Sequence, residues 1–180
     1  MLDRFLEARR ADDLVVLEGF EALENAMRFA EDVLDVAAGD PEAIAARLEP
    51  ALANRFTTLV TKEGLPSDDV LVVAKRPPFE PHPGVAIHLA KATPTDLGRA
   101  IRVAAAAGVA TVYTDQDPWT EEAVKASHGL HFALAVGLAD GTFPALAFSP
   151  RTKVATRAGT TLDLPSALAA ALYGALNGKV

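Results

Sequence analysis

The residues best suited to bind an anion lie in the second half of the chain. Arg102 carries a planar, permanently charged guanidinium, and Asp96 lies one to two helical turns before it. Lys125 adds an ammonium group, and Arg151 and Lys153 form a short basic run in a segment expected to be a loop. These cations could contact phosphate groups, or they could be solvated or form salt bridges. A guanidinium alone is a poor base, because its pKa lies above about 12.

Other chemistries find little support in the sequence. Cysteine is absent, which removes thiolate nucleophiles and cysteine-ligated zinc. His128 and His131 could bind a metal only with a third ligand, and none is apparent, so we expect no metal site. His88 lies inside an apolar strand pattern and is expected to be a core histidine. No P-loop, G-x-G-x-x-G, G-x-S-x-G or H-E-x-x-H motif occurs.

Alternating strands and helices between Val85 and Val136 must position these groups. The apolar segments VAIHLA, ATVYT and HFALAV are rich in β-branched and aromatic residues, and they alternate with helical patterns. Two such repeats without a hairpin signal require crossover connections. The sequence therefore predicts an α/β fold with a parallel sheet flanked by helices.

The helix that carries Arg102 begins at a clear capping signal. Thr93 is typical of an N-cap, Pro94 suits the first helical position, and Asp96 completes a Thr-x-x-Asp capping box. Asp96 is therefore either a capping residue or a site residue. Arg102 lies at the edge of the apolar stripe, so it is either buried with a carboxylate such as Asp96 or Asp115, or directed at the rim of the sheet.

The first 75 residues predict a separate small α/β domain. A helix is expected after the first strand, and a second from Asp40 until Pro50 ends or kinks it. The proline-rich segment at 76–84 is predicted to be a linker to a second domain at 85–180. The strands of the small domain are predicted at 13–17, 33–37, 56–60 and 69–74.

Acidic residues are concentrated in residues 1–50, which contain thirteen Asp and Glu against five Lys and Arg. A surface of this charge does not suit a polyanion, so any RNA contact should lie in the later part of the chain. The charged start M-L-D-R-F-L-E-A-R-R is unlike a signal peptide, and no apolar run approaches a membrane span. We therefore expect a soluble, cytoplasmic protein.

The second half of the chain resembles the SpoU/TrmH family of RNA ribose 2′-O-methyltransferases, of the knotted SPOUT class. The family's first motif is N-x-G-x-x-x-R followed by a helix of small residues and G-V. Asp96, Gly98 and Arg102 have this spacing, and A-A-A-A-G-V follows them. The next signature, an acidic-Pro segment leading to R-A-S-x-G, is matched by D-P at 117–118 and K-A-S-H-G at 125–129.

The second and third motifs of this family are divergent here. No Gly-Asn-Glu follows Val136. Leu164 and Pro165 stand for the family's I-P step and Ser166 for the serine of the third motif, whereas Leu168 replaces the asparagine. The resemblance implies a trefoil knot. The span from Val136 to Ser166 is short for the family, which favours a knot that is reduced or lost by the absence of one strand and its loop.

The resemblance implies a homodimeric enzyme that uses S-adenosylmethionine to methylate structured rRNA or tRNA, with a small substrate-binding domain before the catalytic one. Arg102 would help to activate the ribose hydroxyl, and Leu164, Pro165 and Ser166 would contact the cofactor. Two other functions stay open: a divergent, inactive member that binds RNA or a protein partner, and a structural dimer module. Contacts to RNA are predicted for Asp96, Arg102, Lys125, Arg151 and Lys153.

Overall fold

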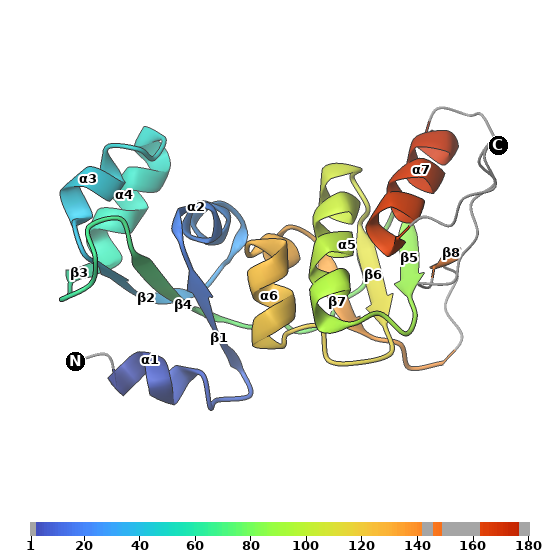
Figure 1. Cartoon of the computed structure of the whole chain (residues 1–180), viewed down its shortest axis with the longest axis horizontal. Helices are drawn as coiled ribbons and strands as arrows, with labels where there is room; N and C mark the ends of the chain where they lie inside the picture. Colours follow the sequence, from blue (N-terminus) through green and yellow to red (C-terminus); the bar gives the residue numbers. More distant parts are fainter. Residues whose placement is uncertain (1–2, 142–145, 149–162, 177–180) are drawn as a thin grey trace. The chain divides into compact units, whose positions relative to one another are not determined.

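The computed structural model describes residues 3–141, 146–148 and 163–176 (Figure 1). The chain divides into two compact units, and each is considered by itself. The first comprises Met1–Pro78 with His128–Ala133, and the second comprises Phe79–Ser127 with Leu134–Val180. Within the described residues, no helix combines the length and apolar character needed to cross a bilayer.

The first unit contains a mixed four-stranded sheet of order β1-β4-β2-β3. β4 is antiparallel to both β1 and β2, and β3 is parallel to β2. The strands are β1 (Leu14–Glu18), β2 (Val33–Ala38), β3 (Val60–Lys62) and β4 (Val70–Lys75). The helices are α1 (Asp3–Ala8), α2 (Phe20–Phe29), α3 (Pro41–Ala45) and α4 (Pro50–Leu59).

The strand predicted at 56–60 is wrong, because most of this segment is the last part of α4. Pro50 occupies the first turn of that helix instead of ending one. At this position a proline lacks only an N–H that would have no helical partner. Phe56 is fully buried, and half-buried Leu52 and Leu59 lie one turn before and after it, so these apolar residues recur at helical spacing.

The second unit contains a sheet in which all strands are parallel, in the order β7-β6-β5-β8. The predicted parallel sheet flanked by helices is confirmed. The third predicted strand begins later than expected, because its first residues form a 3₁₀ turn, η1 (Leu130–Ala133). The strands are β5 (Ala86–Leu89), β6 (Thr111–Thr114), β7 (Ala135–Leu138) and β8 (Leu146–Phe148), and the helices are α5 (Pro94–Ala106), α6 (Glu121–Ser127) and α7 (Leu164–Leu176).

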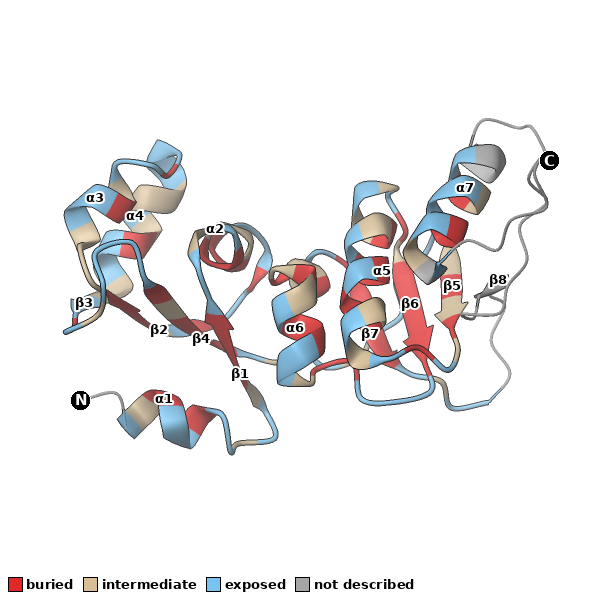
Figure 2. Ribbon diagram, in the orientation of Figure 1, coloured by how far each residue is buried: buried red, intermediate tan, exposed pale blue. Residues whose placement is uncertain are grey.

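Side chains on this sheet alternate between two faces, as the pleat requires. One face packs against α5 and α7 and forms the core of the unit (Figure 2). Its members in register on β5, β6 and β7 are Ile87, Val112 and Val136. The corresponding residues of the opposite face are His88, Tyr113 and Gly137.

Phe79 covers part of this opposite face. Its ring meets Tyr113 edge to face, with 5.5 Å between centroids, and a side chain at Gly137 would overlap it. The backbone N–H of His82 donates to the Thr111 hydroxyl at 2.9 Å, and this hydroxyl donates to the His82 carbonyl at 3.1 Å. The later part of the proline-rich segment is therefore packed on the second unit's sheet.

Candidate active site

The carboxyl ends of the four parallel strands lie at one edge of the second sheet. In open parallel sheets, ligands bind in the crevice outside this edge. We define the carboxyl edge as residues 88–96, 114–119 and 138–141, which end β5, β6 and β7 and begin α5. The candidate site is built from these loops together with the exposed side of α5.

Asp96 caps the helix at this edge. The Thr93 hydroxyl accepts a hydrogen bond from the Asp96 N–H at 3.2 Å and donates to Asp96 Oδ2 at 3.0 Å. The predicted N-cap at Thr93 and helix start at Pro94 are confirmed. The half-buried carboxylate also lies where the helix dipole favours a negative charge. Asp96 thus has a capping role and lies at the candidate site.

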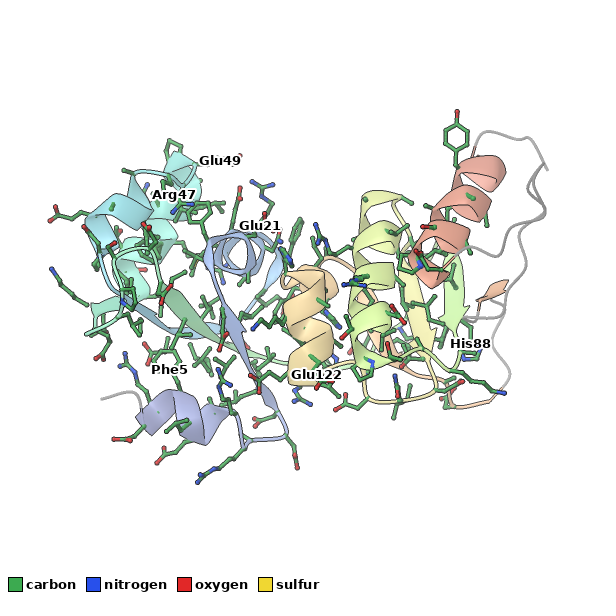
Figure 3. The ribbon with its side chains drawn as sticks, in the orientation of Figure 1. Phe5, Glu21, Arg47, Glu49, His88 and Glu122 are labelled. Carbon is green, nitrogen blue, oxygen red and sulfur yellow. The ribbon has the colours of Figure 1, made fainter. Side chains whose placement is uncertain are left out.

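A second carboxylate, Asp115, joins the loops that follow β5 and β6. Its Oδ1 lies 2.6 Å from Nε2 of His88, the residue labelled beside β5 in Figure 3, and its Oδ2 accepts from the Lys91 N–H at 3.2 Å. Lys91 adopts a left-handed backbone conformation, φ 54°, and the Gln116 amide donates to the Ala92 carbonyl. The His88 side chain is 18% exposed, so this histidine lies at the edge rather than in the core.

Arg102 is exposed on α5. The sequence allowed Arg102 to be either buried with a carboxylate or directed at the rim of the sheet, and its exposure excludes the buried alternative. The residue lies about 12 Å along the helix from Pro94, and helical side chains lean toward the helix N-terminus, which here is the carboxyl edge. Arg99, one turn earlier, is also exposed, as is Lys125 in the last turn of the neighbouring helix α6. Sequence analysis did not single out Arg99.

These three cations, Arg99, Arg102 and Lys125, are here called the basic strip. Arg99 and Arg102 lie on α5 and Lys125 lies on α6. Because these two helices pack against each other, consecutive phosphates of one nucleic-acid backbone can contact both helices. The predicted RNA contacts Arg151 and Lys153 lie outside the described residues.

The predicted cofactor residues Leu164, Pro165 and Ser166 form the first turn of α7. Asp163 caps this helix: Oδ1 accepts from the Ser166 N–H at 2.8 Å, and the carbonyl accepts from the Ala167 N–H at 2.8 Å. Hydrogen bonds from the backbone and then the side chain of Ser166 hold the pKa of the Asp163 carboxyl below its usual 3.8, against a small opposing effect of burial. The positive charge of Arg99 lowers this pKa further, so Arg99 also acts on the start of α7.

Replacing Asp163 with asparagine should remove a pH-dependent part of the stability of α7. A carboxyl whose pKa is lower when folded stabilises the fold above its unfolded pKa, and this contribution disappears as pH falls through the folded pKa. Asparagine still caps the helix but carries no charge. We expect Asp163→Asn to lower the free energy of unfolding slightly at about pH 7, and the difference from the wild type to diminish and then vanish as pH falls through the lowered pKa of the Asp163 carboxyl.

Urea unfolding over a pH series measures this difference. Asp163→Ala is the matched control, since it removes the cap and should destabilise the protein throughout the series. A difference between the wild type and Asp163→Asn that does not change with pH would contradict the prediction.

The carboxyl edge carries an excess of negative charge. Asp96, Asp115, Asp117 and Asp140 lie on it, whereas Lys91 is its one Lys or Arg among the edge residues defined above. Beside them, Leu138 at the end of β7 is 52% exposed and offers an apolar surface. The edge therefore suits a ligand with positive charge and a flat apolar part. In the part of the chain that the structure describes, no three His, Cys, Asp or Glu residues converge on a metal position.

Known proteins resemble this chain in structure. No family model matches the sequence, and no curated protein is significantly similar to it. The SpoU methyltransferase AviRb from Streptomyces viridochromogenes, in complex with AdoMet, matches with a TM-score of 0.68 at 14% identity, over 95% of this chain and 92% of that chain. An RNA 2′-O ribose methyltransferase matches with a TM-score of 0.63 at 17% identity, over 97% and 95%. The chain has the SpoU methyltransferase fold.

Another structure of this fold is the AdoMet-bound rRNA methyltransferase from Sinorhizobium meliloti, with a TM-score of 0.58 at 19% identity, over 96% of this chain and 90% of that chain. The predicted SpoU-like α/β fold is thus confirmed at the level of architecture. The predicted knot lies in the span from Val136 to Ser166, of which residues 142–145 and 149–162 lie outside the described residues. β8 is described, and it joins the sheet beside β5.

Gly98 of the SpoU-like first motif has a packing role. It lies where α5 crosses α6, and a Cβ atom there would be 2.2 Å from the Ala123 carbonyl oxygen and 2.7 Å from the Ala126 Cβ. Only glycine allows this approach. Trp119, which follows Asp117 and Pro118, is 7% exposed and is therefore packed in the protein interior.

Proposed function

We propose that the protein transfers a methyl group from S-adenosylmethionine to a ribose 2′-hydroxyl of structured RNA. The observation that carries this proposal is the first motif, Asp96-Gly98-Arg102, at the start of the helix after β5 in a chain with the SpoU methyltransferase fold. Two structures of this fold are described as AdoMet complexes, and one of these is an rRNA methyltransferase. The motif and the fold therefore support the same chemistry.

The chemistry of the carboxyl edge fits this cofactor. S-adenosylmethionine carries a sulfonium and an ammonium group, which suit the carboxylates of Asp96, Asp115 and Asp140. The adenine ring suits the exposed surface of Leu138. We further propose that the first turn of α7, from Leu164 to Ser166, contacts the cofactor. When bound, the cofactor supplies an electrophilic methyl group.

In this proposal the basic strip holds the RNA. Arg102 contacts the acceptor nucleotide, where the N–H groups of its guanidinium orient the ribose and the neighbouring phosphate. Lys125 neutralises further phosphates, and Arg151 and Lys153 remain predicted contacts. Residues 1–75, joined through 76–84, would act as the small substrate-binding domain of a cytoplasmic homodimer. Structured rRNA or tRNA is the proposed acceptor.

One observation favours the alternative of an inactive, RNA-binding or partner-binding relative. Leu168 stands where the family has an asparagine, and it is fully buried in the core of the second unit. A leucine there donates no hydrogen bond to a ligand. The remaining cofactor contacts would then have to come from backbone groups.

Calorimetric titration with S-adenosylmethionine and S-adenosylhomocysteine tests the proposed function. We expect micromolar binding of both, with a free energy on the order of -8 kcal/mol. Arg102→Ala is the control: because Arg102 is exposed and assigned to the RNA, this variant should fold and bind the cofactor as the wild type does. If neither ligand releases or absorbs heat at millimolar concentration, the alternative becomes the working hypothesis.

A further inference from the structure

An acidic and a basic side chain lie next to each other at the start of α5. Asp96 and Arg99 are three residues apart in the helix, which brings their Cβ atoms to about 5–6 Å from each other. Asp96 Oδ2 accepts from the Thr93 hydroxyl at 3.0 Å. Among the residues that the structure describes, Asp96 Oδ1 and the Arg99 guanidinium have no hydrogen-bonded or ion-paired partner. Both groups are therefore open to a ligand.

Around α5, Arg99 lies farther from α6 than Arg102 does. α5 packs against both α6 and α7 and lies between them (Figure 1). Gly98 marks the side of α5 that faces α6, because a Cβ atom there would meet the Ala123 carbonyl oxygen. Since each residue turns the helix by about 100°, Arg102 is about 40° from Gly98 and Arg99 is about 100° from it. In the same sense of rotation, Asp96 lies about 60° beyond Arg99.

The positive charge of Arg99 acts on the start of α7. Hydrogen bonds from Ser166 are the main cause of the lowered pKa of the Asp163 carboxyl, and the charge of Arg99 lowers this pKa further. Asp163 caps α7, and the first turn of this helix, 164–166, is the proposed cofactor contact. Arg99 therefore lies between Arg102 and the proposed cofactor site.

S-adenosylmethionine has both an ammonium and a carboxylate group on one carbon atom of its methionine part. The ammonium suits the aspartates of the carboxyl edge, but the carboxylate is repelled by them unless a cation lies close to it. Lys91 is the one Lys or Arg within the edge, and Arg99 lies one turn along α5 from it. Of these two cations, Arg99 is the one beside a free carboxylate oxygen and near the start of α7.

We infer that Asp96 and Arg99 together bind the amino-acid part of S-adenosylmethionine, Asp96 through the ammonium and Arg99 through the carboxylate. This inference rests on the proposed function. A guanidinium binds a carboxylate through two parallel hydrogen bonds, so Arg99 fixes the orientation of this group as well as its position. Arg102 and Lys125 are left to the RNA. Arg99 is then a specificity-determining residue, because it selects adenosine ligands that carry a carboxylate.

The test measures the affinity of the full-length protein for three adenosine ligands by calorimetry. S-adenosylmethionine carries both the ammonium and the carboxylate, decarboxylated S-adenosylmethionine keeps only the ammonium of the two, and 5′-methylthioadenosine has neither. Arg99→Gln and Asp96→Asn each remove one charge of the pair. Arg102→Gln is the matched control on the same helix, and Lys91→Gln removes the other nearby cation.

We expect Arg99→Gln to weaken the binding of S-adenosylmethionine by about ten- to a hundredfold, because a charge-assisted pair of hydrogen bonds is lost. Its affinity for the other two ligands should stay within about twofold of the wild type. Asp96→Asn should weaken the binding of both ligands that carry the ammonium and leave that of 5′-methylthioadenosine unchanged. Arg102→Gln and Lys91→Gln should bind all three ligands as the wild type does.

The results that would overturn the inference differ from the result that would overturn the proposed function. If the wild type binds S-adenosylmethionine and Arg99→Gln binds it equally well, Arg99 is not the partner of the carboxylate, and the proposed function is unaffected. A selective loss in Lys91→Gln in place of Arg99→Gln would assign the carboxylate to Lys91 and also contradict the inference. A wild type that binds none of the three ligands removes the proposed function and this inference with it.

Discussion

Replacing Gly98 with alanine is expected to lower the free energy of unfolding of the second unit by about 2 kcal/mol. The added methyl group would lie 2.2 Å from the Ala123 carbonyl oxygen, which is backbone and cannot rotate away. Overpacking of this kind costs about 1–3 kcal/mol or more, whereas the higher helix propensity of alanine returns only about 1 kcal/mol. The steric cost should therefore exceed the propensity gain, and α5 and α6 would have to move apart.

Urea unfolding of Gly98→Ala and Gly64→Ala provides the measurement and its matched control. A Cβ at Gly64 would meet no atom within 4 Å, so this second variant should keep its stability within about 0.5 kcal/mol of the wild type. A Gly98→Ala protein as stable as the control would mean that α5 and α6 do not cross this closely.

Replacing Arg102 with alanine should have the opposite profile, a large loss of activity without a loss of stability. The side chain is exposed, and an exposed charge pair contributes at most about 1 kcal/mol, so the free energy of unfolding should change by less than about 1 kcal/mol. Under the proposed function, it orients the acceptor nucleotide, and loss of a preorganised charged donor typically costs about a hundredfold in rate. We therefore expect methyl transfer to fall by about two orders of magnitude with cofactor binding retained.

Single-turnover transfer to RNA transcripts checks this expectation, and Arg102→Lys is the informative companion. Lysine keeps the positive charge but lacks the planar guanidinium with its paired donors. Partial activity of Arg102→Lys would identify the charge as the main contribution, and near-complete loss would identify the bidentate hydrogen bonding of the guanidinium. An Arg102→Ala protein with wild-type transfer would remove Arg102 from the reaction. Together, Gly98→Ala and Arg102→Ala separate two roles within one motif.

Local signals in the sequence predicted the second unit well. Thr93, Pro94 and Asp96 specify a helix start through bonds among neighbouring residues, and such bonds form in the same way in any fold. The alternation of apolar strands with helices likewise predicted a parallel sheet, because a helix between two strands is long enough for the crossover connection that parallel strands require. These features require no knowledge of distant residues.

The errors and omissions arose where distant contacts decide the outcome. Apolar residues at 56–60 fit a strand or a buried helix equally well, and the helix that begins at Pro50 decides between them. His88 and Asp115 belong to different βα repeats, and only the parallel register of β5 and β6 brings them together. The alternating exposure of β5 was the available signal for His88, since it places this residue on the face opposite the core.

The position of β8 has a consequence for how this protein folds. β5 pairs with β6 across a single helix, but it pairs with β8 only when Ile87 meets Leu146, about sixty positions along the chain. Contacts of such separation form late, because the entropy of closing the intervening loop is lost before the pairing compensates for it. During synthesis on the ribosome, the backbone N–H and C=O groups on one edge of β5 would therefore stay unpaired after β6 and β7 have joined the sheet. This interval is when the nascent chain is most exposed to edge-to-edge association with other chains.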